Sequence, residues 1–414
     1  MNNLNVELYG TLLGKLTSGG RDFDFTTDEK VFEKYPLASV IMSLAVPLNR
    51  RYTAPQRKRA RNFFNELLPE GRNLRWMAQN MEPGERNTYG ILRKYGKDIA
   101  GALLIYDPLD DVSSAKPKTE KADPGKIRYL LENMHKEPLA NSPVSGKTSL
   151  GGVQGKIVLA KKNTSWYRVL YGYPSSHILK PVVPEYPTMI YDESFCMQLA
   201  FEIGLTEYPV WIENFDGADA LVIERYDRDN NLENGRIHQE DFNQVLGAHG
   251  DEKYQEYGGK VSARRIAEII EKTCKADVEK FAAQLIFSII IGNLDMHAKN
   301  VSVFHYPDQS VRLTPVYDQV PLRHQNTDGR MALSIDGEYI HANLTFDSII
   351  DELVSWKTES FKDEKETISF VRNHLESCYS ALEKVGISKN AYPSLKNNIA
   401  SFITNLLSGR RISP

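Results

Sequence analysis

Residues 292–300 read G-N-L-D-M-H-A-K-N, and a Tyr-Asp pair follows at positions 317–318. This stretch comes directly after residues 278–291, which are apolar almost all round and predict a buried central helix. A glycine ends the predicted helix, and burying the polar side chains that follow it would be costly. We therefore expect these side chains in a loop at the edge of the core, where they can meet a ligand.

Two carboxylates and an amide in these stretches have the types and the spacing that phosphoryl transfer requires. Asp295 precedes Asn300 by five positions, as the catalytic base precedes the metal-holding Asn in protein kinases, and Asp318 follows downstream. The reaction needs one carboxylate to accept the proton of the acceptor hydroxyl, and a carboxylate and an amide oxygen to hold Mg²⁺. We therefore assign Asp295 as catalytic base, Asn300 as metal ligand and Asp318 as principal Mg²⁺ ligand of an ATP-dependent phosphotransferase.

Two further side chains of the same loop are assigned supporting roles. Lys299 is expected to offset charge on the transferred phosphoryl group, and His297 to orient the loop by hydrogen bonds rather than to titrate. The alternative is a polar loop at a helix end with an unrelated Asp nearby. The spacing and the order of sheet-rich and helical segments favour the catalytic interpretation.

A glycine-rich stretch, residues 149–156, reads S-L-G-G-V-Q-G-K and is expected to cover the nucleotide phosphates. Glycine lets backbone N–H groups turn toward phosphate oxygens without interference from a Cβ atom. The pattern is neither G-x-G-x-x-G nor a Walker loop, so an ordinary hairpin turn is the alternative. The predicted nucleotide contacts are Gly151, Gly152, Val153, Gln154, Gly155 and Lys156.

Two later strands are expected to complete the nucleotide site. Lys180 ends the strand H-I-L-K, where a kinase places the Lys that neutralises phosphate charge, and Glu193 is its candidate ion-pair partner. The end of the strand L-V-I-E-R, at Glu224, Arg225 and Tyr226, is expected to meet the adenine edge through backbone groups. A solvated Lys and a plain strand exit are the alternatives at these two places.

The composition predicts an ordinary globular protein. The chain has 414 residues, which suits two or three domains, with 41% hydrophobic and 25% charged residues. A net charge of −3 gives no global attraction to nucleic acid or acidic membranes. No apolar run approaches the roughly 20 residues that span a bilayer, the N-terminus is polar, and the three cysteines lack metal-ligand spacing. We therefore expect a cytoplasmic protein with reduced thiols and no membrane partner.

The order of the predicted elements indicates an α+β, two-lobed, protein-kinase-like fold. Residues 1–107 are expected to form an N-terminal subdomain on the sheet-rich lobe. Residues 108–144, rich in Pro, Lys, Asp and Ser, are expected to form a linker interrupted by a helix at 126–134. Residues 145–226 are expected to form the sheet-rich lobe with the ATP loop. Residues 227–414 are expected to form an all-helical C-terminal lobe that carries the catalytic and metal loops, with a hairpin between these loops.

Several short motifs together carry a resemblance to a known family over nearly the full chain. Two lie in the N-terminal subdomain, F-F-N-E-L-L-P-E-G at 63–71 and D-I-A-G-A-L at 98–103. The others are S-L-G-G-V-Q-G-K, H-I-L-K-P, L-V-I-E-R-Y-D-R, H-Q-E-D-F at 238–242, G-N-L-D-M-H-A-K-N and Y-D. The chain resembles the HipA family, the serine/threonine kinase toxins of bacterial HipA–HipB toxin–antitoxin systems.

The resemblance implies properties that spacing does not show. Ser149 matches the family's autophosphorylated serine, whose modification expels the loop from the nucleotide site and switches the kinase off. Residues 151–156, Lys180 and residues 224–226 match ATP-contacting positions. The implied partners are a HipB-like helix-turn-helix antitoxin, operator DNA mainly through that antitoxin, and a protein substrate. Family substrates include aminoacyl-tRNA synthetases, whose phosphorylation blocks charging and halts translation.

Other interpretations stay open at this point. A small-molecule kinase of the aminoglycoside-phosphotransferase or lipid-kinase type also lacks a D-F-G triplet. A catalytically silent corepressor bound to an antitoxin is a second alternative, although the intact catalytic and metal residues argue against it. A basic run could contact DNA phosphates, but a solvated helix face is the favoured interpretation. This run consists of Arg50, Arg51, Arg57, Lys58, Arg59 and Arg61.

Overall fold

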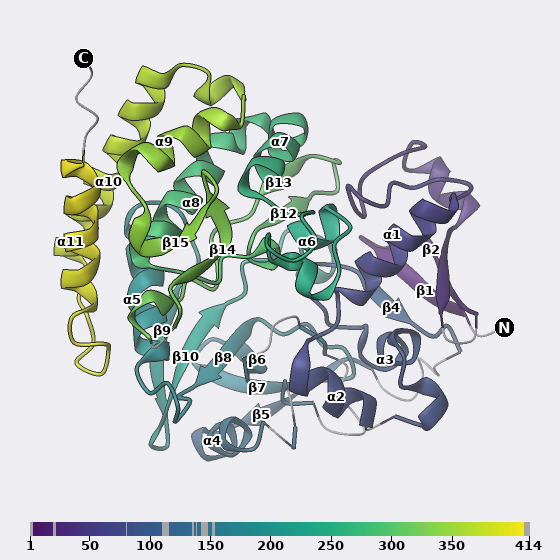
Figure 1. Cartoon of the computed structure of the whole chain (residues 1–414). Helices are drawn as coiled ribbons and strands as arrows, with labels where there is room; N and C mark the ends of the chain where they lie inside the picture. Colours follow the sequence, from purple (N-terminus) through teal and green to yellow (C-terminus); the bar gives the residue numbers. More distant parts are fainter. Residues whose placement is uncertain are drawn as a thin grey trace. The chain divides into compact units, whose positions relative to one another are not determined.

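The chain folds into two compact units, each built from separate stretches of sequence (Figure 1). The first unit comprises Met1–Pro181, Glu213–Glu240 and Phe304–Ser310, and the second comprises Val182–Ile212, Asp241–Val303 and Val311–Pro414. The structure, a computed structural model, describes residues 3–19, 22–79, 81–109, 116–134, 136–137, 139–141, 148–150, 154–325 and 327–409.

The first unit begins with a four-stranded sheet in the order β3-β2-β1-β4. Its strands are β1 (Asn3–Leu8), β2 (Thr11–Ser18), β3 (Phe23–Thr27) and β4 (Leu104–Tyr106). Side chains of β1 alternate between half-buried and buried, so Leu4, Val6 and Leu8 enter the core while their neighbours face outward. Three helices accompany the sheet, namely α1 (Ala54–Asn65), α2 (Gly71–Gln79) and α3 (Thr88–Tyr95).

Helix α1 shows how sequence signals position this part of the core. Thr53 and Gln56 form a reciprocal capping box that starts the helix. Phe63 and Phe64 lie near its other end and are fully buried. The ring of Phe64 lies 5.5 Å from that of Phe25 on β3, which ties the helix to the sheet.

A six-stranded sheet forms the rest of the first unit's framework, in the order β5-β7-β6-β8-β10-β9. Its strands are β5 (Lys118–Ala122), β6 (Ile157–Lys162), β7 (Ser165–Leu170), β8 (His177–Pro181), β9 (Val210–Phe215) and β10 (Ala218–Glu224). Strand β5 and helix α4 (Pro124–Glu132) occupy part of the stretch expected to be a linker. Strand β5 is polar because it forms the edge of the sheet and buries only Ala122, so it lacks an apolar alternation.

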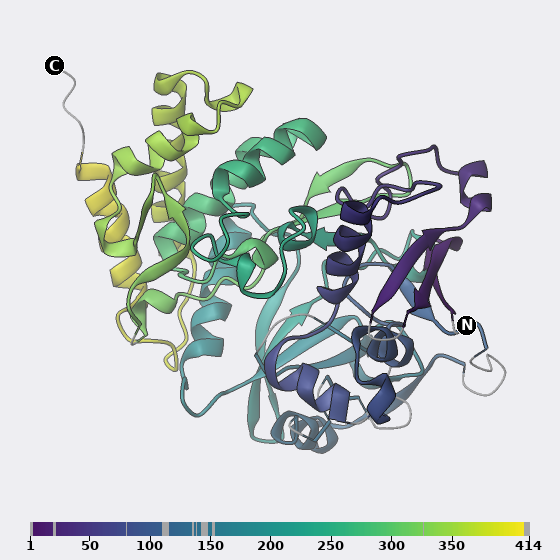
Figure 2. The same ribbon diagram turned by 45° about the vertical axis from the view of Figure 1, so that its right-hand side comes forward.

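Helices dominate the second unit. They are α5 (Met189–Glu202), α6 (Phe242–Val245), α7 (Ala263–Thr273), α8 (Val278–Ile291), α9 (Phe346–Ser355), α10 (Glu364–Lys384) and α11 (Leu395–Ser408). Helix α8 has the bounds that the sequence predicts and is buried at all positions except its first-turn Glu279 and Lys280. Helix α10 packs against α5, α8, α9 and α11, and α11 is the yellow helix in Figure 2.

Short strands also occur in the second unit, which is predominantly helical rather than all-helical. They are β12 (Ser302–His305), β13 (Val311–Leu313), β14 (Arg330–Ile335) and β15 (Glu338–Ile340). Strands β12 and β13 neighbour each other in a three-stranded sheet with β11 (His238–Asp241), as the expected hairpin requires. The boundaries between the two units fall within β9, β11 and β12, at the end of β8 and just before β13. Among the described residues, no helix combines the length and the apolar character that crossing a bilayer requires.

Candidate active site

The loop that carries Asp295 begins where α8 ends. Gly292 adopts the left-handed conformation, with φ of 74°, and its N–H donates to the carbonyl oxygen of Ile289. A Cβ atom at this position would lie 2.5 Å from Cβ of Arg323, so only glycine fits the turn. The buried helix therefore stops at this residue, and the polar stretch leaves it in a fixed direction.

Asn293 joins the two loops that hold the predicted catalytic residues. Its side-chain oxygen accepts the N–H of Asp295 at 3.0 Å, and its side-chain nitrogen donates to the carbonyl oxygen of Asp318 at 3.3 Å. One amide side chain thus fixes both carboxylate-bearing segments of the second unit. The sequence interpretation gave Asn293 no role, although its place directly after the helix-ending glycine is a usable signal.

The Asp295 carboxylate is oriented but reachable. Its side chain is 46% exposed, Oδ1 accepts from the Tyr254 hydroxyl at 3.3 Å, and Oδ2 lies 3.8 Å from Nε2 of His297. The backbone N–H of His297 also donates to the carbonyl oxygen of Asp295 at 2.8 Å. The His297 ring lies edge-on to the ring of Tyr254. The loop therefore presents a half-exposed carboxylate with a tyrosine and a histidine beside it.

Asn300 lies at the end of a one-turn 3-10 helix, Ala298–Asn300, on the other side of this loop. Its side-chain nitrogen donates to the carbonyl oxygen of Asp295 at 2.8 Å. Because the nitrogen makes this bond, the amide oxygen, which is the atom that binds a metal, is left for another contact. Lys299 is buried, and its carbonyl oxygen accepts from the Tyr317 hydroxyl at 2.8 Å.

Asp318 follows Tyr317 and has a backbone conformation that few residues with a side chain adopt. Its φ is 54°, in the left-handed region. Gln319 supports the turn, because its side-chain nitrogen donates to the carbonyl oxygen of Tyr317 and its oxygen accepts from Ser288 of α8. A non-glycine residue held in this way is a frequent feature of functional sites.

The oxygen atoms of Asn300 and Asp318 suit a hard divalent cation. Mg²⁺ usually takes one or two carboxylates and completes its shell with phosphate oxygens and water. No group of three or more His, Cys, Asp or Glu side chains that could hold a metal occurs in the part of the chain that the structure describes. An amide oxygen and a carboxylate are donors of the type that Mg²⁺ accepts beside phosphate oxygens and water.

The remaining predicted nucleotide contacts lie in the first unit. Lys180 is buried on β8, where it pairs with Leu221 of β10. Gln154, Gly155 and Lys156 precede β6 and are half-buried, whereas the predicted contacts at positions 151–153 lie outside the described residues. Glu193 lies in the second unit, buried on α5, so its predicted pairing with Lys180 stays a prediction.

The three residues at the end of β10 differ in burial, and they are Glu224, Arg225 and Tyr226. Glu224 ends β10 and is exposed, and Tyr226 is half-buried. The N–H of Arg225 donates to the carbonyl oxygen of Ser176 at 2.9 Å, so this group is engaged within the first unit. The adenine contact expected here would have to use the other backbone groups of the stretch.

Ser149 is fully buried in the first unit. Its hydroxyl donates to the carbonyl oxygen of Leu67 at 3.2 Å, and its N–H donates to that of Asp98 at 2.9 Å. In this state the hydroxyl is out of reach of a phosphoryl donor.

The basic run of the N-terminal subdomain is partly neutralised. Arg50 forms an ion pair with Glu29, and Arg61 forms ion pairs with Asp22 and Asp24. These contacts favour a solvated, internally paired surface over a surface that attracts phosphates.

Comparison with known proteins agrees with this geometry. The HipA N-terminal domain matches residues 4–106, and the HipA-like C-terminal domain matches residues 148–392. The Sinorhizobium fredii protein Y4mE is 31% identical over 346 residues, which cover 80% of each chain. The serine/threonine-protein kinase toxin HipA of Shewanella oneidensis is 26% identical over 358 residues, which cover 81% of this chain and 79% of that protein.

A solved structure shares the fold. The complex of HipA and HipB from Shewanella oneidensis MR-1 with operator DNA contains a chain that superposes with a TM-score of 0.78. The match covers 98% of this chain and 96% of that chain at 21% identity. Together with the domain matches, of which the C-terminal one alone spans more than half of the sequence, these findings show that the chain belongs to the HipA family of kinases.

Proposed function

We propose that this protein is an ATP- and Mg²⁺-dependent serine/threonine protein kinase. The observation that carries the proposal is a set of hydrogen bonds between two loops of the second unit. Asn293 bonds to the backbone of Asp295 and Asp318, and the Tyr317 hydroxyl bonds to the carbonyl oxygen of Lys299. These bonds fix Asp295, Asn300 and Asp318 on neighbouring segments. Phosphoryl transfer depends mainly on such positioning and on electrostatic stabilisation, because the protein has little covalent chemistry to perform.

Each of the three side chains has a distinct role in this proposal. Asp295 accepts the proton of the acceptor hydroxyl, and its half-exposed carboxylate is suited to meet a protein substrate. Asn300 and Asp318 would hold Mg²⁺, which would neutralise the charge of the nucleotide phosphates. His297 orients the loop, and Lys299 offsets charge on the transferred group.

In the first unit, Lys180 and residues 154–156 would contact the phosphates of ATP. The stretch at positions 151–153 and the strand exit at 224–226 complete the proposed nucleotide site. Lys180 has a suitable place on a central strand, since its neighbours β6 and β10 hold β8 on both sides.

We further propose that the kinase acts as the toxin of a toxin–antitoxin pair. The Shewanella oneidensis relative is named a kinase toxin, and the structure that shares the fold is a complex with HipB and operator DNA. By analogy, the partner would be a helix-turn-helix antitoxin that also binds the operator. The substrate would be a component of translation, with an aminoacyl-tRNA synthetase as the first candidate, and Ser149 would be the site of autophosphorylation.

The test is phosphoproteomics of a bacterial lysate incubated with the pure protein and ATP, with Asp295→Asn as the matched control. We expect new phosphoserine or phosphothreonine on a translation component, and a transfer rate lower by roughly 10²–10⁴ in the variant, the usual contribution of a general base. Phosphate found only on a small molecule would replace the proposal with a metabolite kinase. Near-wild-type turnover of Asp295→Asn would remove this residue from its role.

A further inference from the structure

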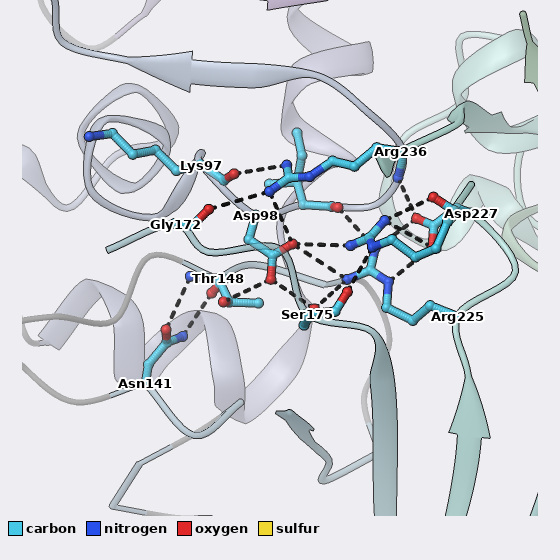
Figure 3. A network of polar contacts seen from close by, with 12 residues as sticks. Lys97, Asp98, Asn141, Thr148, Gly172, Ser175, Arg225, Asp227 and Arg236 are labelled. Atoms are coloured by element: carbon cyan, nitrogen blue, oxygen red, sulfur yellow. Dashed lines mark hydrogen bonds and ion pairs between the residues drawn. The ribbon is translucent and has the colours of Figure 1, made fainter. Parts of the chain in front are cut away.

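A buried cluster of charges in the first unit joins the N-terminal subdomain to the sheet (Figure 3). It contains three guanidiniums and two carboxylates, from Arg225, Arg228, Arg236, Asp98 and Asp227. The side chain of Asp98 is 0% exposed and that of Arg225 is 2% exposed. Burying so many charges requires that each has a close partner of opposite sign.

Asp98 is the member of this cluster that also holds Thr148. Its Oδ1 lies 3.2 Å from the guanidinium of Arg228 and 3.7 Å from those of Arg225 and Arg236. Its Oδ2 accepts from the Thr148 hydroxyl at 3.1 Å and from the Ser175 hydroxyl at 2.8 Å. One carboxylate oxygen therefore faces the cations, and the other holds two hydroxyls (Figure 3).

The short segment 148–150, which precedes the glycine-rich loop, is held mainly through Asp98 and Asn141. Asp98 and Thr148 form a parallel bridge, and the carbonyl oxygen of Asp98 accepts the N–H of Ser149. Asn141 makes two bonds to the backbone of Thr148, accepting its N–H at 3.1 Å and donating to its carbonyl oxygen at 2.7 Å. Thr148, Ser149 and Leu150 are all buried as a result.

The two oxygens of the Asp98 carboxylate make different kinds of contact, ion pairs on Oδ1 and hydrogen bonds to hydroxyls on Oδ2. The cations outnumber the carboxylates in the cluster by one, and burial, together with the neighbouring Arg225 guanidinium, lowers the pKa of Arg228 to about 9. Asp98 is therefore held firmly by charge, since an ionised carboxylate is the partner that these guanidiniums need. Segment 148–150 brings no charge to the cluster and is held by hydrogen bonds rather than ion pairs, so this segment can detach while the ion pairs of the cluster stay intact.

From this asymmetry we propose that Asp98 is a positioning residue that latches segment 148–150, and that Ser149 accepts a phosphoryl group only when this latch is open. The inference rests on the proposed function, in which Ser149 is the phosphoacceptor. With the latch closed, the Ser149 hydroxyl is fully buried and bonded to the backbone of Leu67. A phosphate here would also place roughly 1.5 to 2 negative charges beside the main chain of a buried Asp.

The chemical step is an ordinary phosphoryl transfer. A bond forms between Oγ of Ser149 and the γ-phosphorus of ATP, and the bond from that phosphorus to the ADP oxygen breaks. The hydroxyl proton passes to the general base, and ADP leaves. The N-terminal subdomain thus takes part in regulation, because it supplies the carboxylate that sets how often Ser149 becomes available.

The two hydroxyls on the same oxygen of Asp98 offer a matched pair of variants. Thr148→Val removes one of the bonds that hold the segment and keeps the shape of the side chain. Ser175→Ala removes the other bond to the same oxygen, together with the bond that Ser175 accepts from Arg225 at 2.9 Å, and leaves the segment's own contacts in place. Both variants keep every charge of the cluster, unlike Asp98→Asn, which is at risk of not folding.

The first measurement is hydrogen exchange without ATP, followed by mass spectrometry of peptides that contain residues 148–150. We expect exchange in this segment to be roughly 10- to 100-fold faster in Thr148→Val than in wild type, the range implied by one lost hydrogen bond to a carboxylate, and unchanged in Ser175→Ala. Asn141→Ala should accelerate it as well. Equal exchange in wild type, Thr148→Val and Asn141→Ala would overturn the latch.

The second measurement adds ATP and Mg²⁺ and follows the initial rate of phosphorylation at Ser149. We expect a rise in Thr148→Val by the same factor as the exchange, and none in Ser175→Ala. Faster exchange with an unchanged, measurable phosphorylation rate would overturn the link between the latch and Ser149. Faster exchange with no phosphate on Ser149 in any variant would instead overturn the proposed role of this serine, while the latch itself would stand.

Discussion

Asp318 combines a proposed metal-binding carboxylate with a left-handed backbone, which Asp and Asn tolerate better than Ala. We expect Asp318→Ala to weaken productive binding of Mg·ATP, because the metal loses a charged ligand and the turn loses a suitable residue. The thermal shift produced by Mg·ATP and the rate of phosphoryl transfer should both fall.

Asp318→Asn separates these two causes. The amide keeps the tolerance for the left-handed conformation and removes only the negative charge, so the melting temperature without ligand should stay near that of wild type. The shift on adding Mg·ATP should still shrink. If ATP protection and transfer rate were unchanged in both variants, Asp318 would have no part in metal binding.

Gly292 is a second residue whose replacement the structure makes predictable. Gly292→Ala should destabilise the protein by more than the roughly 1–2 kcal/mol of a left-handed Ala, because the new Cβ would also meet Arg323. Gly337→Ala is the matched control, since that glycine has φ of 80° but a Cβ there would meet no described atom within 4 Å. Urea denaturation of both variants measures the difference, and equal losses would contradict the steric argument.

The candidate site shows what a sequence reveals at the scale of single residues. The spacing of Asp295 and Asn300 identifies the loop, because residue types at fixed intervals carry chemistry that can be recognised. The bonds of Asn293 are beyond such reasoning, because they depend on how two loops fold toward each other. The same holds for the carboxylate of Asp98, whose cationic partners lie more than 120 positions away in the sequence.

Helix α10 carries a half-buried histidine, His374, that should make the second unit sensitive to acid. Burial lowers the pKa of His374 to about 4, although a backbone contact with Ala283 of α8 raises it slightly. The unfolded chain binds a proton near the usual pKa of 6.5, whereas the folded chain resists protonation until about 4. The contribution of neutral His374 to the free energy of unfolding is therefore fully present above pH 6.5. It falls as the pH decreases toward 4, by at most about 1.4 kcal/mol per pH unit.

His374→Gln tests this assignment, because Gln fills a similar space and does not titrate. The melting temperatures of wild type and variant should be compared at pH 7 and pH 5. We expect the melting temperature to drop less from pH 7 to pH 5 in the variant than in wild type. Part of the drop should remain, because burial also lowers the pKa values of His177 and His324 to about 4. An equal decrease in both proteins would show that His374 does not contribute.

At the scale of elements, apolar periodicity was a good guide where burial is uniform. It predicted α8 with its observed bounds because nearly every side chain of that helix is buried. It missed β5 because an edge strand that faces water carries the same Lys and Glu residues as a linker. Helix α7 was also not among the expected helices, although its Ser262 cap and buried Ile266 and Ile270 form a recognisable pattern.

The division of the whole molecule into interleaved units could not be predicted from local patterns, because these do not show which distant segments meet. The first unit needs residues 213–240 to supply β10, the inner neighbour of β8, and the three arginines that face Asp98. A fragment ending at residue 181 should therefore fail to fold, with β8 left as an open edge and a buried carboxylate without its cations.

A fragment ending at residue 240 serves as the comparison. It restores β10 and the arginine partners, so we expect it to resist limited proteolysis better than the shorter fragment. Circular dichroism and gel filtration of both fragments would measure the difference. Equal folding of the two would show that the later stretch is dispensable for the first unit.

The interleaving also bears on how the protein is made. A ribosome that has just finished residue 181 must still synthesise as far as residue 310 before the first unit is complete. At 5 to 20 residues per second this interval is on the order of ten seconds. Throughout it, the nascent chain carries an unfinished sheet with apolar strands, and we expect chaperones to bind this exposed surface.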